Sequence, residues 1–250
     1  MFKLIRFEFR KLLRNKGFYI CTAILIALTG FSVYTAKFAQ EQLGVTDPTA
    51  GGLKSMMEAL PTSSIGMMLG IFIALYVCED FSAGTIRNIL TRGYSRFGVY
   101  MAKLVAVIIA TIVMSCFCCA GAYAVGTYLW GAGDASFGGE QFRILLYQLA
   151  ITLAYAAVFY AVSFMIQKTG GSIACCVVLP LAVTALLKLA DTALAEQEIE
   201  LSAYWLDSFN HNIASISAES EDLRKALAGS GIYFGASLII GWLATMKREY

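Results

Sequence analysis

The stretch from Leu104 to Trp130 reads LVAVIIATIVMSCFCCAGAYAVGTYLW and contains no Asp, Glu, Lys, Arg or His. A helix that crosses a bilayer needs about 20 mostly apolar residues, so this run is long enough to span a membrane. The whole chain shares the bias, because 58% of its 250 residues are hydrophobic and only 14% are charged. A water-exposed fold cannot bury so much apolar surface. The sequence therefore predicts an all-α integral membrane protein.

Six such charge-free runs occur along the chain. The predicted spans are residues 17–36, 60–78, 104–130, 144–167, 169–187 and 226–246. The fifth run contains Pro180, which removes a backbone hydrogen bond and predicts a kink. The longest segment between spans, 188–229, is too short for a separate domain. Residues 1–250 are therefore expected to form a single transmembrane domain.

The distribution of Lys and Arg predicts how the chain is oriented, since positive residues accumulate on the cytosolic side. If both termini are cytosolic, the inner segments hold thirteen basic and four acidic residues, a net charge of +9. The outer segments then hold six basic and thirteen acidic residues, a net charge of −7. We therefore expect a multi-pass protein of the cell (plasma) membrane with both termini in the cytosol.

Residues 1–16 have the pattern of an amphipathic helix that lies in the membrane interface and contacts lipid. Apolar residues recur at three- and four-residue steps, at Phe2, Ile5, Phe9, Leu12 and Leu13. The basic residues of the opposite face are Lys3, Arg6, Arg10 and Arg14. A simpler interpretation is that these charges only fix the topology.

The segment 79–103, between the second and third spans, is predicted to be cytosolic and to contain a short helix. Thr85 is a plausible N-cap and Gly93 a plausible helix end. Ile86, Ile89 and Leu90 form one apolar stripe of this helix. A two-turn amphipathic helix between spans is suited to binding a partner protein.

This segment resembles the first cytosolic loop of ABC-2 type export permeases. The resemblance is carried by an acid, a Gly-Thr pair, a short helix, a Ser-Arg pair and a lysine, at Asp80, Gly84, Thr85, Leu90, Ser95, Arg96 and Lys103. The six-span plan and the N-terminal helix are similar to the same family, in its type V exporter-like architecture. Gly93 and Tyr94 replace a proline often found at the turn, which resembles the branch for peptide-antibiotic immunity and bacitracin resistance.

The resemblance implies a permease that exports a hydrophobic or amphipathic cargo (a peptide, antibiotic or lipid-like molecule) and pairs with itself or a related permease. A separate pair of ATP-binding subunits would hold ATP and magnesium. The helix Thr85–Arg92 would be the coupling helix. The ATPase-coupling residues would be Asp80, Gly84, Thr85, Ile86, Arg87, Ile89, Leu90, Arg92 and Arg96. In the outer loop, 188–229, Tyr204, Trp205 and Phe209 would form an outer gate, or else anchor a solvated cap in the membrane interface.

Residues with catalytic or metal-binding chemistry are scarce. The chain has one histidine, its seven cysteines match no metal-binding spacing, and no glycine is followed by lysine, which excludes a P-loop. We therefore expect no catalytic, cofactor-binding or metal-binding residues, and no nucleic-acid partner. Two alternatives to the exporter remain open: an ion-coupled secondary carrier, and a non-transporting membrane sensor or scaffold with the same fold.

Overall fold

The computed structural model describes residues 2–43, 51–61, 63–131, 137–193, 204–213 and 220–246. In these ranges every regular element is an α-helix. The helices are α1 (Phe2–Arg14), α2 (Lys16–Leu43), α3 (Gly52–Ala59), α4 (Ser63–Ser82), α5 (Thr85–Thr91), α6 (Arg96–Trp130), α7 (Gly139–Ile166), α8 (Thr169–Ala193), α9 (Leu206–Ile213) and α10 (Ser220–Met246). Six of those described, α2, α4, α6, α7, α8 and α10, are long and apolar enough to cross a membrane. This confirms the predicted all-α class and the six spans.

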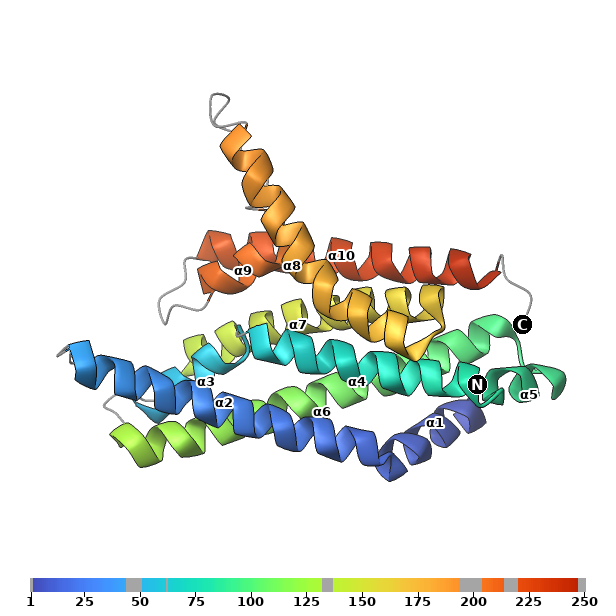
Figure 1. Ribbon diagram of the computed structural model, residues 1–250, viewed down its shortest axis with the longest axis horizontal. Helices are drawn as coiled ribbons and strands as arrows, with labels where there is room; N and C mark the ends of the chain where they lie inside the picture. Colours follow the sequence, from blue (N-terminus) through green and yellow to red (C-terminus); the bar gives the residue numbers. More distant parts are fainter. Residues whose placement is uncertain are drawn as a thin grey trace.

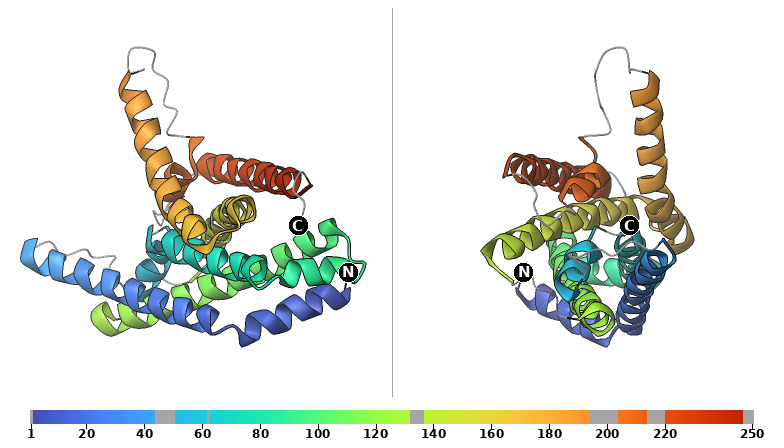
Figure 2. Two further views of the ribbon diagram at one scale, coloured as in Figure 1. Left: turned by 45° about the vertical axis from the view of Figure 1, so that its right-hand side comes forward. Right: turned by 90° about the vertical axis from the view of Figure 1, so that its left-hand side faces the viewer.

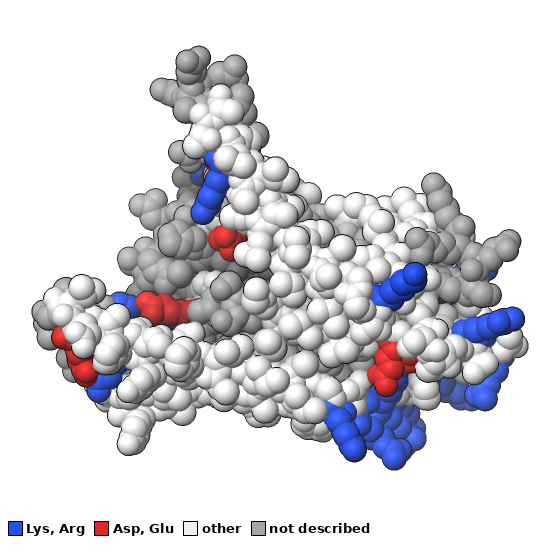
Figure 3. Space-filling view, in the orientation of Figure 1, with Lys and Arg blue, Asp and Glu red and all other residues white. Residues whose placement is uncertain are grey.

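Apart from α8, the long helices run roughly along the length of the molecule, and the short helices lie toward its two ends (Figure 1). One end carries α1 and α5, and the other carries α3 and α9. Lys and Arg side chains gather at the end that carries α1 and α5 (Figure 3). We call this the basic end and the other the opposite end.

The six spans differ in how much of their surface the bundle covers. In their most apolar windows, 61% of the α7 residues and 56% of the α4 residues are buried, against 6% for α8. The centre of the bundle is filled by large apolar side chains such as Phe72, Ile73, Met114, Ile151 and Phe159. Helix α8 therefore lies at the edge of the bundle, and most of its surface is free for lipid or another protein.

Helix α8 approaches the bundle closely at one point and then leaves it. A Cβ atom added at Gly70 of α4 would lie 3.0 Å from Cβ of Cys176, so the missing side chain permits this contact. Pro180 lies inside the helix, and beyond it α8 projects from the body of the molecule (Figures 1 and 2). The predicted kink agrees with this change of direction.

Several helix boundaries differ from the charge-free runs. Helix α4 continues past residue 78 to Ser82, and α6 begins at Arg96 rather than at 104. These extensions contain Glu79, Asp80 and Lys103, charged residues that have partners at the basic end. The charged residues that bounded the charge-free runs therefore lie inside α4 and α6 and do not mark the ends of these helices.

The segments that were predicted to lie outside contain helical residues beyond the charge-free runs. Helix α8 extends to Ala193, and α9 lies within the predicted loop 188–229. Residues 194–203 and 214–219 of that loop lie outside the described residues. Helix α3 was not predicted at all; it packs against α6, where Ser55 of α3 faces Gly126 and an added Cβ would lie 2.5 Å from its Oγ.

Candidate functional site: a buried charge network beside a short exposed helix

Helix α1 has three faces rather than the two that were predicted. Leu4, Glu8 and Leu12, at four-residue steps, are buried against the bundle. Phe2, Phe9 and Leu13 are exposed on a neighbouring face. The basic residues occupy the remaining surface. The prediction placed Leu12 in the lipid-facing stripe, which is wrong because Leu12 is buried against the bundle, and it did not consider Glu8.

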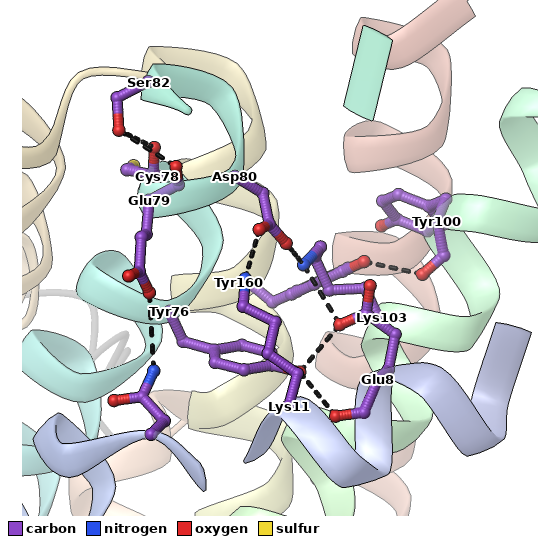
Figure 4. A network of polar contacts seen from close by, with 11 residues as sticks. Glu8, Lys11, Tyr76, Cys78, Glu79, Asp80, Ser82, Tyr100, Lys103 and Tyr160 are labelled. Atoms are coloured by element: carbon purple, nitrogen blue, oxygen red, sulfur yellow. Dashed lines mark hydrogen bonds and ion pairs between the residues drawn. The ribbon is translucent and has the colours of Figure 1, made fainter. Parts of the chain in front are cut away.

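Glu8 belongs to a network of charges at the basic end, shown in Figure 4. Lys103 of α6 forms ion pairs with Glu8, at 3.3 Å, and with Asp80 of α4. Lys11 of α1 pairs with the other carboxylate oxygen of Asp80. The Tyr76 hydroxyl donates a hydrogen bond to Glu8 Oε2 at 2.7 Å. The network thus joins α1, α4 and α6.

The network is almost completely removed from solvent. Glu8, Asp80 and Lys103 are 1%, 2% and 0% exposed, and the Lys103 ammonium lies 4.8 Å from the centre of the Tyr76 ring. Burying a charge is costly unless it is paired and hydrogen-bonded. Two carboxylates and two ammonium groups balance here, so the arrangement is tolerated only while all three helices keep their relative positions.

Helix α5 lies next to this network. It follows Gly84, whose φ of +64° is a left-handed conformation suited to glycine. Thr85 is the first residue of the helix, so its predicted role as N-cap is wrong; Gly84 holds that position. Gly93 follows the helix with φ +84°, and its amide donates a hydrogen bond to the Leu90 carbonyl. The predicted helix end at Gly93 is confirmed.

The apolar stripe of α5 faces the body of the protein. Ile86 is 5% exposed, while Ile89 and Leu90 pack against the buried side chains of Leu4 and Val99. The exposed face consists of Arg87, Asn88, Thr91 and Arg92. Of the residues predicted to couple to an ATPase, the arginines of α5 are therefore accessible, whereas its aliphatic residues hold α5 against α1 and α6.

The remaining predicted coupling residues have different surroundings. Asp80 is buried in the network, and Arg96 is exposed at the start of α6. A groove of about 800 Å³ runs beside α5 and is lined by Arg87 together with Gln167 and Lys168 from the turn between α7 and α8. This groove and the exposed face of α5 form one basic surface.

At the opposite end, two of the three predicted gate residues are buried. The Trp205 ring packs edge-on against Tyr155 of α7 and Tyr233 of α10, with centroids 6.4 and 5.5 Å apart. Phe209 is 9% exposed, whereas Tyr204 is 72% exposed. Trp205 and Phe209 thus hold α9 against α7 and α10.

Within the described ranges, no three His, Cys, Asp or Glu side chains are close enough together to hold a metal ion. His211 lies on α9, and its side chain is outside the described part. The site consists of a membrane bundle, a short helix with an exposed basic face, and a charge network beside it that joins α1, α4 and α6.

A six-span bundle with a surface helix and a short helix between its second and third spans is the architecture of a multi-pass membrane protein. A family model described as ABC-2 family transporter protein matches residues 4–190, three quarters of the chain. The protein therefore belongs to the ABC-2 transporter family, whose members act as membrane subunits together with ATP-binding subunits. The match includes most of α1, all of α5 and every residue of the charge network. No curated protein matches the sequence.

Proposed function

We propose that this protein is the permease subunit of an ATP-driven exporter of the plasma membrane, with its basic end in the cytosol. It moves a hydrophobic or amphipathic cargo outward, such as a peptide, antibiotic or lipid-like molecule. ATP and magnesium bind to a separate ATPase subunit. The observation that carries this proposal is the network of the buried Glu8, Asp80 and Lys103 with the partly exposed Lys11, which joins α1, α4 and α6 beside α5.

The network gives α5 the properties of a lever. Helix α5 is joined to α4 and α6 by short turns at Gly84 and Gly93, and its apolar stripe packs against α1 and α6. A push on α5 is therefore passed to several helices at once instead of bending a loop. Packed bundles respond to such a push by switching between discrete arrangements.

The basic surface of α5 supplies the docking face for the ATPase. Arg87 and Arg92 are exposed on α5, and Lys168 lies across the groove from Arg87. Positive charges arranged in this way attract an acidic cleft and orient it on approach. The aliphatic residues of α5 are then positioning residues that keep this face presented.

Helix α1 is suited to hold the basic end at the membrane surface. Its exposed apolar residues, Phe2, Phe9 and Leu13, lie beside the basic face. Such a helix buries its apolar face at the boundary of the acyl chains and its cations near anionic headgroups. We therefore propose membrane lipid as its partner.

A second permease, identical or related, is proposed to pack against α2 and α8. In the most apolar part of each helix only 6% of the α8 residues and 33% of the α2 residues are buried, and α10, at 22%, is exposed as well. The exposed side chains of α2 and α8 include Phe31, Tyr34, Val178 and Leu186. Apolar surfaces of this extent in the two flanking spans are suited to a permease pair.

The proposal is tested by reversing the charge of the α5 face in the complex with the ATPase. The double variant Arg87→Glu, Arg92→Glu should lose cargo-stimulated ATP hydrolysis and binding of the ATPase subunit, because the docking face becomes repulsive. Arg143→Glu, an exposed arginine at the other end of the molecule, serves as control and should retain both. ATPase binding unaffected by the double variant would contradict the proposal.

The same experiment separates the two alternatives. An ion-coupled carrier would transport cargo without ATP and lose transport when an ionophore removes the ion gradient. A scaffold would bind its partner, but cargo would not stimulate hydrolysis. The buried charges at the basic end are paired with one another, so they do not form the open ionisable site that ion-coupled carriers need.

A further inference from the structure

A cavity of about 350 Å³ lies between α4, α7 and α8 and reaches α9 at the opposite end. Its walls are mainly apolar, with Ile65 and Leu69 from α4, Phe159 from α7 and Leu181 from α8. It lies in the angle between the projecting half of α8 and the body of the molecule, which Figure 3 shows as a hollow. Neither the charge network nor α5 borders this cavity.

One wall of the cavity is a continuous stripe of α8. Val177, Leu181, Thr184 and Lys188 line the cavity at three- and four-residue steps. At 1.5 Å per residue, the stripe is roughly 16 Å long.

The charged lining residues lie on opposite walls. Lys188 belongs to α8 and Asp207 to α9, and both are exposed side chains that line the cavity. The rest of the lining is uncharged, with Thr152 and Tyr155 as further polar residues. A ligand with one apolar chain, one anionic group and one cationic group matches this distribution.

The cavity is accessible from the side that faces the membrane. Leu181 lines the cavity, yet it is 57% exposed, and the α8 window as a whole is 6% buried. A molecule dissolved in the bilayer can therefore reach the cavity by passing beside α8. Lipids are the most abundant molecules with the required shape in that environment.

We propose that this cavity binds one acyl chain of a zwitterionic phospholipid, with the phosphate at Lys188 and the ammonium group at Asp207. Phosphatidylethanolamine has this combination, because its primary ammonium group can donate hydrogen bonds to a carboxylate. Phosphatidylglycerol has the phosphate but no cation. The inference does not depend on the proposed export function, since binding requires neither ATP nor a partner subunit.

The cavity can be filled without disturbing its walls. Gly66 lines it, and a Cβ atom added there meets no atom within 4 Å. Leucine at this position therefore occupies the space proposed for the acyl chain. Gly235 of α10 has the same free surroundings but does not line the cavity, so Gly235→Leu is a matched control.

Trp205 is a suitable reporter, because it is 8% exposed and contacts Tyr155, a lining residue. The full chain with Trp130→Phe and Trp242→Phe is reconstituted in nanodiscs of phosphatidylcholine. Phosphatidylethanolamine or phosphatidylglycerol with brominated acyl chains is then added in steps, and quenching of Trp205 fluorescence is measured. Exposed ion pairs are worth up to about 1 kcal/mol, so we expect half-maximal quenching at an up to about fivefold lower fraction of phosphatidylethanolamine.

Variants of the cavity test whether the lipid preference arises from the cavity and from Asp207. Gly66→Leu should remove the preferential quenching, whereas Gly235→Leu should retain it. Asp207→Asn should make the two lipids equivalent, because the partner of the ammonium group is lost. Equal quenching by both lipids in the unmodified protein, or a preference that persists in Gly66→Leu, overturns the proposal. Thermal unfolding of both leucine variants in detergent identifies any loss of fold.

Discussion

The charge network at the basic end and the cavity beside α8 are built in opposite ways. At the network, buried charges from α1, α4 and α6 pair directly, so that none of these helices can move alone without exposing an unpaired charge. At the cavity, α8 touches the bundle through apolar side chains and leaves a space of about 350 Å³. Apolar contacts are non-directional. The comparison indicates a tightly joined region at the basic end and a loosely packed region at α8.

The largest expected effect is the loss of the central cation of the network. Lys103→Met leaves Asp80 and Glu8 with a single ammonium group, and removal of one partner from a buried pair costs about 3–5 kcal/mol. The free energy of unfolding in detergent should fall by this amount. Adding Asp80→Asn balances the charges again and should recover part of the loss. If Lys103→Met left the free energy of unfolding unchanged, the claim that the charge network holds α1, α4 and α6 together would be contradicted.

A smaller effect is expected from the network's neutral member. Tyr76→Phe removes a hydroxyl that donates to Glu8 at 2.7 Å in a buried site, which should cost about 1–3 kcal/mol. Tyr19→Phe is the control, since the Tyr19 hydroxyl bonds to the Leu13 carbonyl on an exposed surface. Thermal unfolding of the two variants side by side measures the difference. Equal melting temperatures would show that the tyrosine does not support Glu8.

The smallest effect on stability is expected at the loosely packed helix α8. Leu181→Ala shortens a side chain of α8 that is 57% exposed, and should change stability by less than about 0.5 kcal/mol. Ile151→Ala, at a fully buried position of α7, should cost about 2–5 kcal/mol. Denaturant unfolding of both variants tests whether α8 is as loosely held as the structure indicates.

Hydropathy predicted the parts of the fold that depend on composition. The runs without charges located all six spans, and the pair Gly84 and Gly93 bracketed α5. Hydropathy could not locate α3, because its eight residues are too few for a span. The burial of α3 depends on the close approach of Ser55 to Gly126. That contact is tertiary and leaves no periodic signal in the sequence.

The network was only partly visible in the sequence. Asp80 and Lys103 were recognised through the family resemblance, but their pairing was not. Glu8 was missed, although a signal existed: it is the one acid in a basic helix and lies four residues from Leu4 and from Leu12. A lone carboxylate in an apolar stripe predicts a buried cation on a neighbouring helix. Which cation it meets depends on how the helices pack.

The central claim is that α5 and the network move as one body while α8 moves relative to them. Spin labels on the exposed positions Arg6 of α1, Thr91 of α5 and Leu186 of α8, introduced in pairs, test it in the complex with the ATPase. Distances are measured by double electron–electron resonance with and without a non-hydrolysable ATP analogue. The account predicts an unchanged distance between α1 and α5 and a changed distance between α5 and α8. A nucleotide-dependent change between α1 and α5, with α8 unmoved, would contradict it.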